Sequence, residues 1–202
     1  RRFPLAVVSG AVFAMAGWTF SYLSMYSYGN TIDTSPYLKA IFASALGMVL
    51  FTGLTLLAEN MFQKRDFRIL LTLCGVPILL AYYFLTPDFS FMFREKSAAI
   101  QFILLLFGFL LFFFLSPYLA KRKNKNFSSF LFYAALRLLF TVVATIVVFA
   151  GISLAFFSVE QLFSIDLPDE IYLKVWYLSV GLFALPFFLK GILKIYVGEF
   201  VY

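Results

Sequence analysis

The chain has 202 residues, of which 63% are hydrophobic and 13% are charged, with 29 phenylalanines, one cysteine and no histidine. Ordinary globular domains contain about 45–50% apolar and about 25% charged residues. A soluble domain of this length could not bury so much apolar surface, because its surface-to-volume ratio is too high. The composition excludes a soluble globular domain, a disulfide scaffold and a nucleic-acid-binding protein, despite a formal net charge of +6. It predicts an integral membrane protein whose main partner is the lipid bilayer.

Six apolar stretches are candidates for membrane spans, since a helix needs about 20 mostly apolar residues to cross about 30 Å of hydrocarbon. We therefore predict an all-α, polytopic transmembrane helix bundle that forms a single domain over residues 1–202 of a longer chain. In chain order, the spans are about 4–26, 37–58, 69–85, 98–120, 130–159 and 174–196. The third is short, and the fifth is long enough to tilt or project. A transmembrane β-barrel is disfavoured, because residues 102–115 are apolar throughout and do not alternate.

The positions of Lys and Arg predict the orientation of the chain. With the amino terminus inside, eleven Lys and Arg residues lie on the inner side and four on the outer side, so both termini are predicted to be cytoplasmic. The basic run between Lys121 and Lys125 is interpreted as a loop that sets this topology, rather than as a nucleic-acid site. It would also attract anionic lipid at the inner surface.

Small residues four apart predict close helix packing in lipid. Ala6, Gly10 and Ala14 form such a stripe on the first span. Packing within the bundle explains it, and the alternative is an interface with a second copy or another membrane protein. Pro77 and Pro186 lie inside the third and sixth spans, where they should bend the helix or free a carbonyl group.

Arg137 is the most informative polar residue, because it lies inside the fifth span, where a charge is costly. Thr141 and Thr145 share its helix face at four-residue spacing, and Glu59 is the nearest acidic candidate partner. Three interpretations remain open: the side chain reaches back to the inner headgroups, it pairs with another helix, or it binds a solute or ion.

Four carboxylates lie in or beside the longest outer segment, and they could together bind Ca²⁺. They are Glu160, Asp166, Asp169 and Glu170. Their spacing matches no EF-hand loop and includes no glycine turn. Without histidine, a Cys–His nucleophile and a His/Cys zinc site are excluded, and no phosphate or dinucleotide fingerprint occurs. We therefore predict no catalytic residue, metal or cofactor.

Short motifs at both ends carry a resemblance to a family of polytopic membrane proteins. The chain opens with Arg2-Phe3-Pro4-Leu5 and ends with Leu193-Lys194-Ile195-Tyr196 and Glu199-Phe200-Val201-Tyr202, around Phe/Leu-rich spans and cationic inner loops. In these features it resembles the bacterial domain-of-unknown-function family numbered 4153. The resemblance implies a multi-pass protein of the bacterial inner membrane and supplies no catalytic residues.

Three functions are compatible with these patterns. The scarcity of polar groups inside the spans favours a non-catalytic membrane module: an anchor, a sensor or an assembly domain. The alternative is a transporter or permease subunit for a small solute or ion, with a pocket near Arg137 opened by bends at Pro77 and Pro186. The third is an intramembrane enzyme that uses the outer carboxylates on lipid or glycan, although it would lack histidine, the commonest general base.

Overall fold

The computed structural model describes residues 3–26, 34–61, 65–86, 96–119, 127–165 and 167–198, and all of its regular elements are helical. The prediction of an all-helical fold is confirmed for these residues. In chain order the elements are α1 (Pro4–Tyr26), α2 (Ser35–Met61), α3 (Arg65–Leu73), α4 (Gly75–Leu85), α6 (Lys96–Leu119), α7 (Phe127–Phe163), α8 (Glu170–Leu178), the π-helical turn η1 (Ser179–Ala184) and α9 (Leu185–Gly198).

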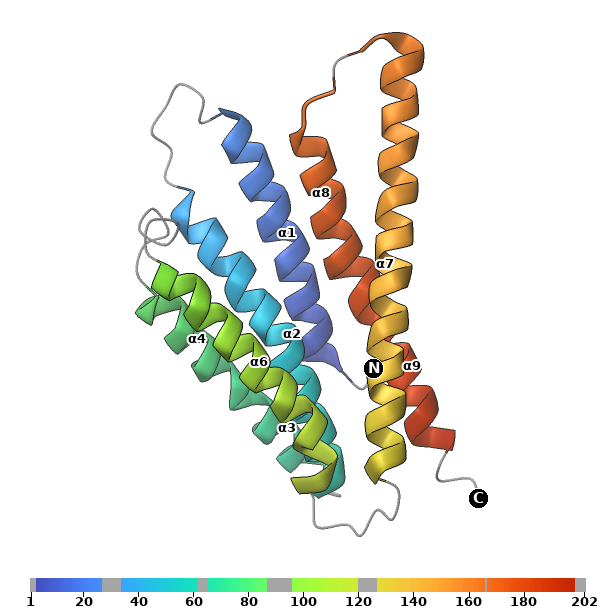
Figure 1. Cartoon of the computed structure of the whole chain (residues 1–202). Coiled ribbons are helices and arrows are strands. Elements are labelled where there is room, and N and C mark those ends of the chain that lie inside the picture. The colour runs from blue at the N-terminus through green and yellow to red at the C-terminus, as the bar shows by residue number, and fades with distance from the viewer. Residues whose placement is uncertain are drawn as a thin grey trace.

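Successive helices run in opposite directions through the bundle (Figure 1). The short pair α3–α4 makes one traverse, and α8, η1 and α9 together make the last. As a result, α1 begins and α9 ends at the same end of the molecule. Such alternation is typical of helical bundles with short connections.

Within the described ranges, five helices are long and apolar enough to cross a membrane: Pro4–Ser24, Ser35–Glu59, Ala99–Ser116, Leu131–Phe163 and Glu170–Ile192. The stretch Ile69–Leu85 is a shorter apolar segment. The protein thus has the helices of a membrane protein. The fifth predicted span lies in α7. This helix has 37 residues and is therefore about 55 Å long.

The third apolar stretch is not one helix, as the sequence suggested, but two. The helix is interrupted at Cys74, between α3 and α4, and this side chain is exposed rather than packed. Pro77 provides the physical reason. It has no N–H for the carbonyl of Leu73, and its ring would clash with that carbonyl in a continuous helix. The expected effect of Pro77 is therefore a break one turn before the proline.

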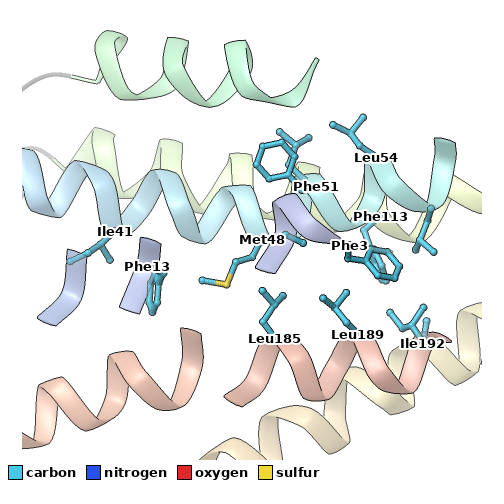
Figure 2. Close-up of a cluster of buried hydrophobic side chains, with 14 of the residues drawn as sticks. Phe3, Phe13, Ile41, Met48, Phe51, Leu54, Phe113, Leu185, Leu189 and Ile192 are labelled. Carbon is cyan, nitrogen blue, oxygen red and sulfur yellow. The ribbon is translucent and has the colours of Figure 1, made fainter. Parts of the chain in front are cut away.

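Helix α2 forms the centre of the bundle. In its most apolar window 78% of residues are buried, against 11% in α6 and in α7. Around it, α1, α3, α4 and α6 pack directly on α2, while α7 packs on η1, α9 and α8. Figure 2 shows Leu185, Leu189 and Ile192 of α9 projecting toward Met48 of α2 and Phe3 in the buried cluster. The helices α6 and α7 thus leave most of their apolar side chains uncovered by the rest of the described chain.

The last traverse contains a widened turn, η1, which ends just before Pro186. Pro186 cannot donate to the carbonyl of Leu182, four residues earlier, and a π-type turn moves that carbonyl away from the ring. The predicted disturbance at Pro186 therefore takes the form of a π-helical turn.

Candidate functional site

Arg137 lies on α7 and extends to α9. Its terminal nitrogen donates a hydrogen bond to the backbone carbonyl of Phe187 at 2.8 Å. The guanidinium carbon also lies 4.3 Å from the centre of the Phe187 ring, within cation–π range. In the described part of the chain, the charge is therefore held by a carbonyl dipole and an aromatic face.

Gly191 makes room for this contact. A Cβ atom at Gly191 would overlap the guanidinium group of Arg137. In a helix, residue 191 lies one turn after residue 187, so a side chain there would cover the Phe187 carbonyl. That carbonyl has a second lone pair, which can accept from Arg137 in addition to the helix bond. This geometry corresponds to the second of the three interpretations, in which Arg137 pairs with another helix.

Thr141 and Thr145 use their hydroxyl groups within α7. Thr141 donates to the carbonyl of Arg137 at 2.8 Å, and Thr145 donates to the carbonyl of Thr141 at 2.7 Å. Both residues are buried. On the helix face that Arg137, Thr141 and Thr145 share, the two hydroxyl groups therefore form local hydrogen bonds within α7. Ser and Thr hydroxyl groups are often paired in this way inside helices.

A cavity of about 300 Å³ adjoins Thr141 between α2, α6, α7 and the last traverse. Its walls are almost entirely apolar, and include Met48, Phe113, Leu138 and Phe188. The hydroxyl of Thr52, which also lines it, donates to the carbonyl of Met48. This cavity is chemically suited to hydrocarbon, and its described lining offers no charged group to a solute.

Several other buried hydroxyl groups are satisfied in the same way. They donate to a carbonyl three or four residues earlier in their own helix, as seen for Ser21, Ser44, Thr55 and Ser116. Such pairing commits the hydroxyl protons of these four residues to their own helices.

Glu59, the expected acidic partner of Arg137, is half-buried near the end of α2. Helix α7 packs chiefly on η1, α9, α8 and α6 rather than on α2. The polar contact of Arg137 is to Phe187, and the structure does not bring Glu59 and Arg137 together.

The outer carboxylates are spread over two helices. Glu160, on α7, accepts a hydrogen bond from the Tyr172 hydroxyl at 3.2 Å, while Asp169 precedes α8 and Glu170 begins it. Asp166 lies outside the described residues. Within the described ranges, no three Asp, Glu or Cys residues are grouped closely enough to hold a metal ion. The Glu160–Tyr172 bond links α7 to the last traverse.

The small-residue stripe packs within the chain. Ala6 and Ala14 are buried, and Gly10 and Ala14 contact Gly181 of η1. Further along α1, Gly17 contacts the ring of Tyr177, and a Cβ atom at Gly17 would overlap that ring. The stripe is the interface between α1 and the last traverse.

Sequence reasoning missed the partners of these residues, Phe187, Gly191 and Gly181. Gly181 and Gly191 flank Pro186 at distances of five residues. Glycines so placed in an apolar helix are a signal for close approach, which could have been read beside the stripe on α1.

Comparisons with protein-family models, with curated proteins and with solved structures found no match.

Proposed function

We propose that this protein is a non-catalytic membrane module that crosses the bilayer six times, with both termini in the cytoplasm. In this proposal the pair α3–α4 supplies the third crossing, although it is shorter and interrupted. The alternation of helix directions supports an even number of traverses (Figure 1). The excess of Lys and Arg at one end supports the orientation.

The observation that carries the proposal is the role of Arg137. A residue that binds a solute would present its guanidinium group to a wet cavity. Here the group lies against α9, with a carbonyl and an aromatic ring as partners. In this proposal the charge of Arg137 lies within the membrane and joins α7 to the last traverse. This favours an anchor, sensor or assembly domain over a permease.

The nature of the neighbouring cavity supports the same conclusion. A permease subunit for a small solute or ion needs a hydrated pocket near the middle of the membrane. The cavity beside Thr141 has apolar walls, and the hydroxyl groups of Thr52 and Thr141 are satisfied by their own helices. Water would find almost no partners in it.

Water access at Thr141 is the direct test. The free cysteine is first removed by Cys74→Ala, and Thr141→Cys is then treated with a water-soluble maleimide on permeabilised cells. We expect slow labelling, because a thiol in an apolar site stays protonated and dry. Ile165→Cys, at an exposed linker position, is the reactive control. If Thr141→Cys is labelled as fast as Ile165→Cys, the result would favour a permease and overturn the proposal of a non-catalytic membrane module.

The remaining parts of the proposal concern the surroundings of the protein. The family resemblance supports a bacterial inner membrane. The basic run between Lys121 and Lys125 supports attraction to anionic lipid at the cytoplasmic surface. The exposed apolar faces of α6 and α7 offer surface to lipid, to a second copy or to another membrane protein.

A further inference from the structure

A groove separates α4 from α6. Both helices pack on α2, and the groove between them has Leu46 of α2 at its base. Its volume is about 460 Å³, and we name it the α4–α6 groove. It is lined by Leu46, Ile78, Leu79, Tyr82, Leu85, Thr86, Gln101, Leu104, Leu105 and Phe109.

The polar groups of the α4–α6 groove lie at one end. Tyr82 and Thr86 are in the last turn of α4 and just after it, and Gln101 is near the start of α6. Since the two helices run in opposite directions, these positions share the end of the bundle that is outside in the proposed orientation (Figure 1). Toward the middle of the bundle the lining is apolar. The groove therefore changes from polar to apolar along its length.

The hydroxyl group of Tyr82 is buried and has no hydrogen-bond partner among the described residues. The side chain of Thr86 lies next to that of Tyr82, and its hydroxyl donates its own proton to the backbone carbonyl of Tyr82. A buried hydroxyl without a partner is unfavourable, and a ligand that brings an acceptor would satisfy it. Gln101, which also lines the groove, offers a further amide donor.

The residues around the groove indicate whether a ligand would enter it from the lipid or from water. Phe84, Leu85 and Leu104 beside it are 78%, 80% and 65% exposed. In a membrane-embedded chain such side chains meet hydrocarbon. The described lining contains no charged residue, so it suits an uncharged acceptor rather than a phosphate.

We propose that the α4–α6 groove binds an acyl chain of a membrane glycerolipid, with the ester carbonyl accepting hydrogen bonds from Tyr82 and Gln101. The chain lies along Ile78, Leu79, Leu105 and Phe109, and the headgroup remains at the outer surface. This assignment rests on the membrane embedding of the proposed function. It adds a specific lipid site to the proposed membrane module.

Photolabelling tests the site. The full chain is reconstituted in vesicles of phosphatidylethanolamine and phosphatidylglycerol that contain a phosphatidylcholine with a diazirine in its acyl chain. After illumination, labelled residues are mapped by mass spectrometry. We expect labelling at Leu104 and Leu105 to exceed that at Leu154, an equally exposed residue of α7 (Leu104 65%, Leu154 69%). Equal labelling of the two helices would overturn the proposal.

Matched variants separate the site from general lipid contact. Tyr82→Phe removes only the hydroxyl group, and we expect it to lower groove labelling about threefold or more, as loss of one hydrogen bond implies. Tyr83→Phe, on the neighbouring tyrosine that does not line the groove, should leave labelling unchanged. Leu105→Trp should fill the groove and abolish labelling, while Ile103→Trp, outside the lining, should not. Labelling that Tyr82→Phe and Leu105→Trp leave intact would contradict the assignment.

Two further readouts complete the test. A diazirine fatty acid that labels the groove better than the phosphatidylcholine would overturn the ester assignment. Flotation with the vesicles reports on embedding separately. A chain that floats but shows no preference for the groove overturns only the lipid site, whereas a chain that does not float overturns the proposed function as well.

Discussion

Gly10 of α1 and Gly181 of η1 bring their backbones into direct contact. A Cβ atom at Gly181 would lie 2.5 Å from the carbonyl oxygen of Gly10, and a Cβ atom at Gly10 would lie 2.7 Å from the carbonyl oxygen of Gly181. Neither backbone can give way as a flexible side chain would. Close approach of this kind is a main source of helix association in lipid, where the hydrophobic effect does not act between helices.

The first prediction is that Gly10→Ala and Gly181→Ala each destabilise the bundle. Overpacking in a tight interior costs about 1–3 kcal/mol, and the added methyl group here meets backbone. Gly108→Ala and Gly151→Ala are matched controls, because nothing lies within 4 Å of a Cβ atom at either position. The controls should not lose stability, and they should gain up to about 1 kcal/mol because Ala favours a helix more than Gly does. Thermal unfolding in detergent, followed by circular dichroism, measures the difference, and equal effects at all four glycines would refute it.

The second prediction concerns the contact between Arg137 and α9. Arg137→Met should lower stability by about 1–3 kcal/mol, because a charge-assisted hydrogen bond and a cation–π contact are lost. Gly191→Val should have a similar effect, since its side chain displaces the guanidinium group. The double variant tests whether both act on one contact: its loss should be smaller than the sum of the two single losses. Additive losses would show that Gly191 does not act through Arg137.

The helices were largely predictable from sequence, but their partners were not. The stretch from Pro4 to Tyr26 coincides with α1, because its apolar length is bounded by the polar segment that follows. For Arg137 the sequence indicated a costly charge, and hydropathy left its partner open. The partner is a backbone carbonyl, a group that every residue carries, so the identity of Phe187 provided no signal.

The two prolines show a second limit. Their positions predicted disturbance of the helix, and both disturbances are present, at Cys74 and at η1. The missing N–H of proline is accompanied by an interruption of the helix at Cys74 in one case and by the widened turn η1 in the other. Tertiary contacts decide between these results: η1 holds Gly181 against α1, while Gly75 lies close to Phe51 and Leu54 of α2. Such contacts depend on distant parts of the chain.

The third prediction concerns η1. A π-type turn contains about one residue more than an α-helical turn, and it keeps the Leu182 carbonyl away from Pro186. Deletion of Leu182, which is 55% exposed, should restore a regular helix and force a clash with the proline, at a cost of about 3 kcal/mol. Adding Pro186→Ala should recover most of that loss. Deletion of Val147 in α7 is the control, because no change at Pro186 should rescue it. A Leu182 deletion that Pro186→Ala does not rescue would contradict this account.

The fourth prediction tests how often the chain crosses the membrane. In a Cys74→Ala background, Gln63→Cys and Ser90→Cys flank the α3–α4 pair in sequence. If the pair crosses, an impermeant maleimide should label Ser90→Cys in intact cells and Gln63→Cys only after permeabilisation. Asn124→Cys should follow Gln63→Cys, because its loop carries the basic run, and Ile165→Cys should follow Ser90→Cys.

The pattern of labelling distinguishes the topologies. If α3–α4 does not cross and Gln63→Cys stays inside, Ser90→Cys becomes inaccessible in intact cells, and the two later positions change sides: Asn124→Cys becomes accessible from outside and Ile165→Cys does not. Pro77 lies within this short segment, so a failed crossing would mean that the break at Cys74 turns α4 back toward the surface from which α3 entered. The expected result instead places the break inside the bundle, where Gly75 fits against Phe51 and Leu54 of the central helix α2.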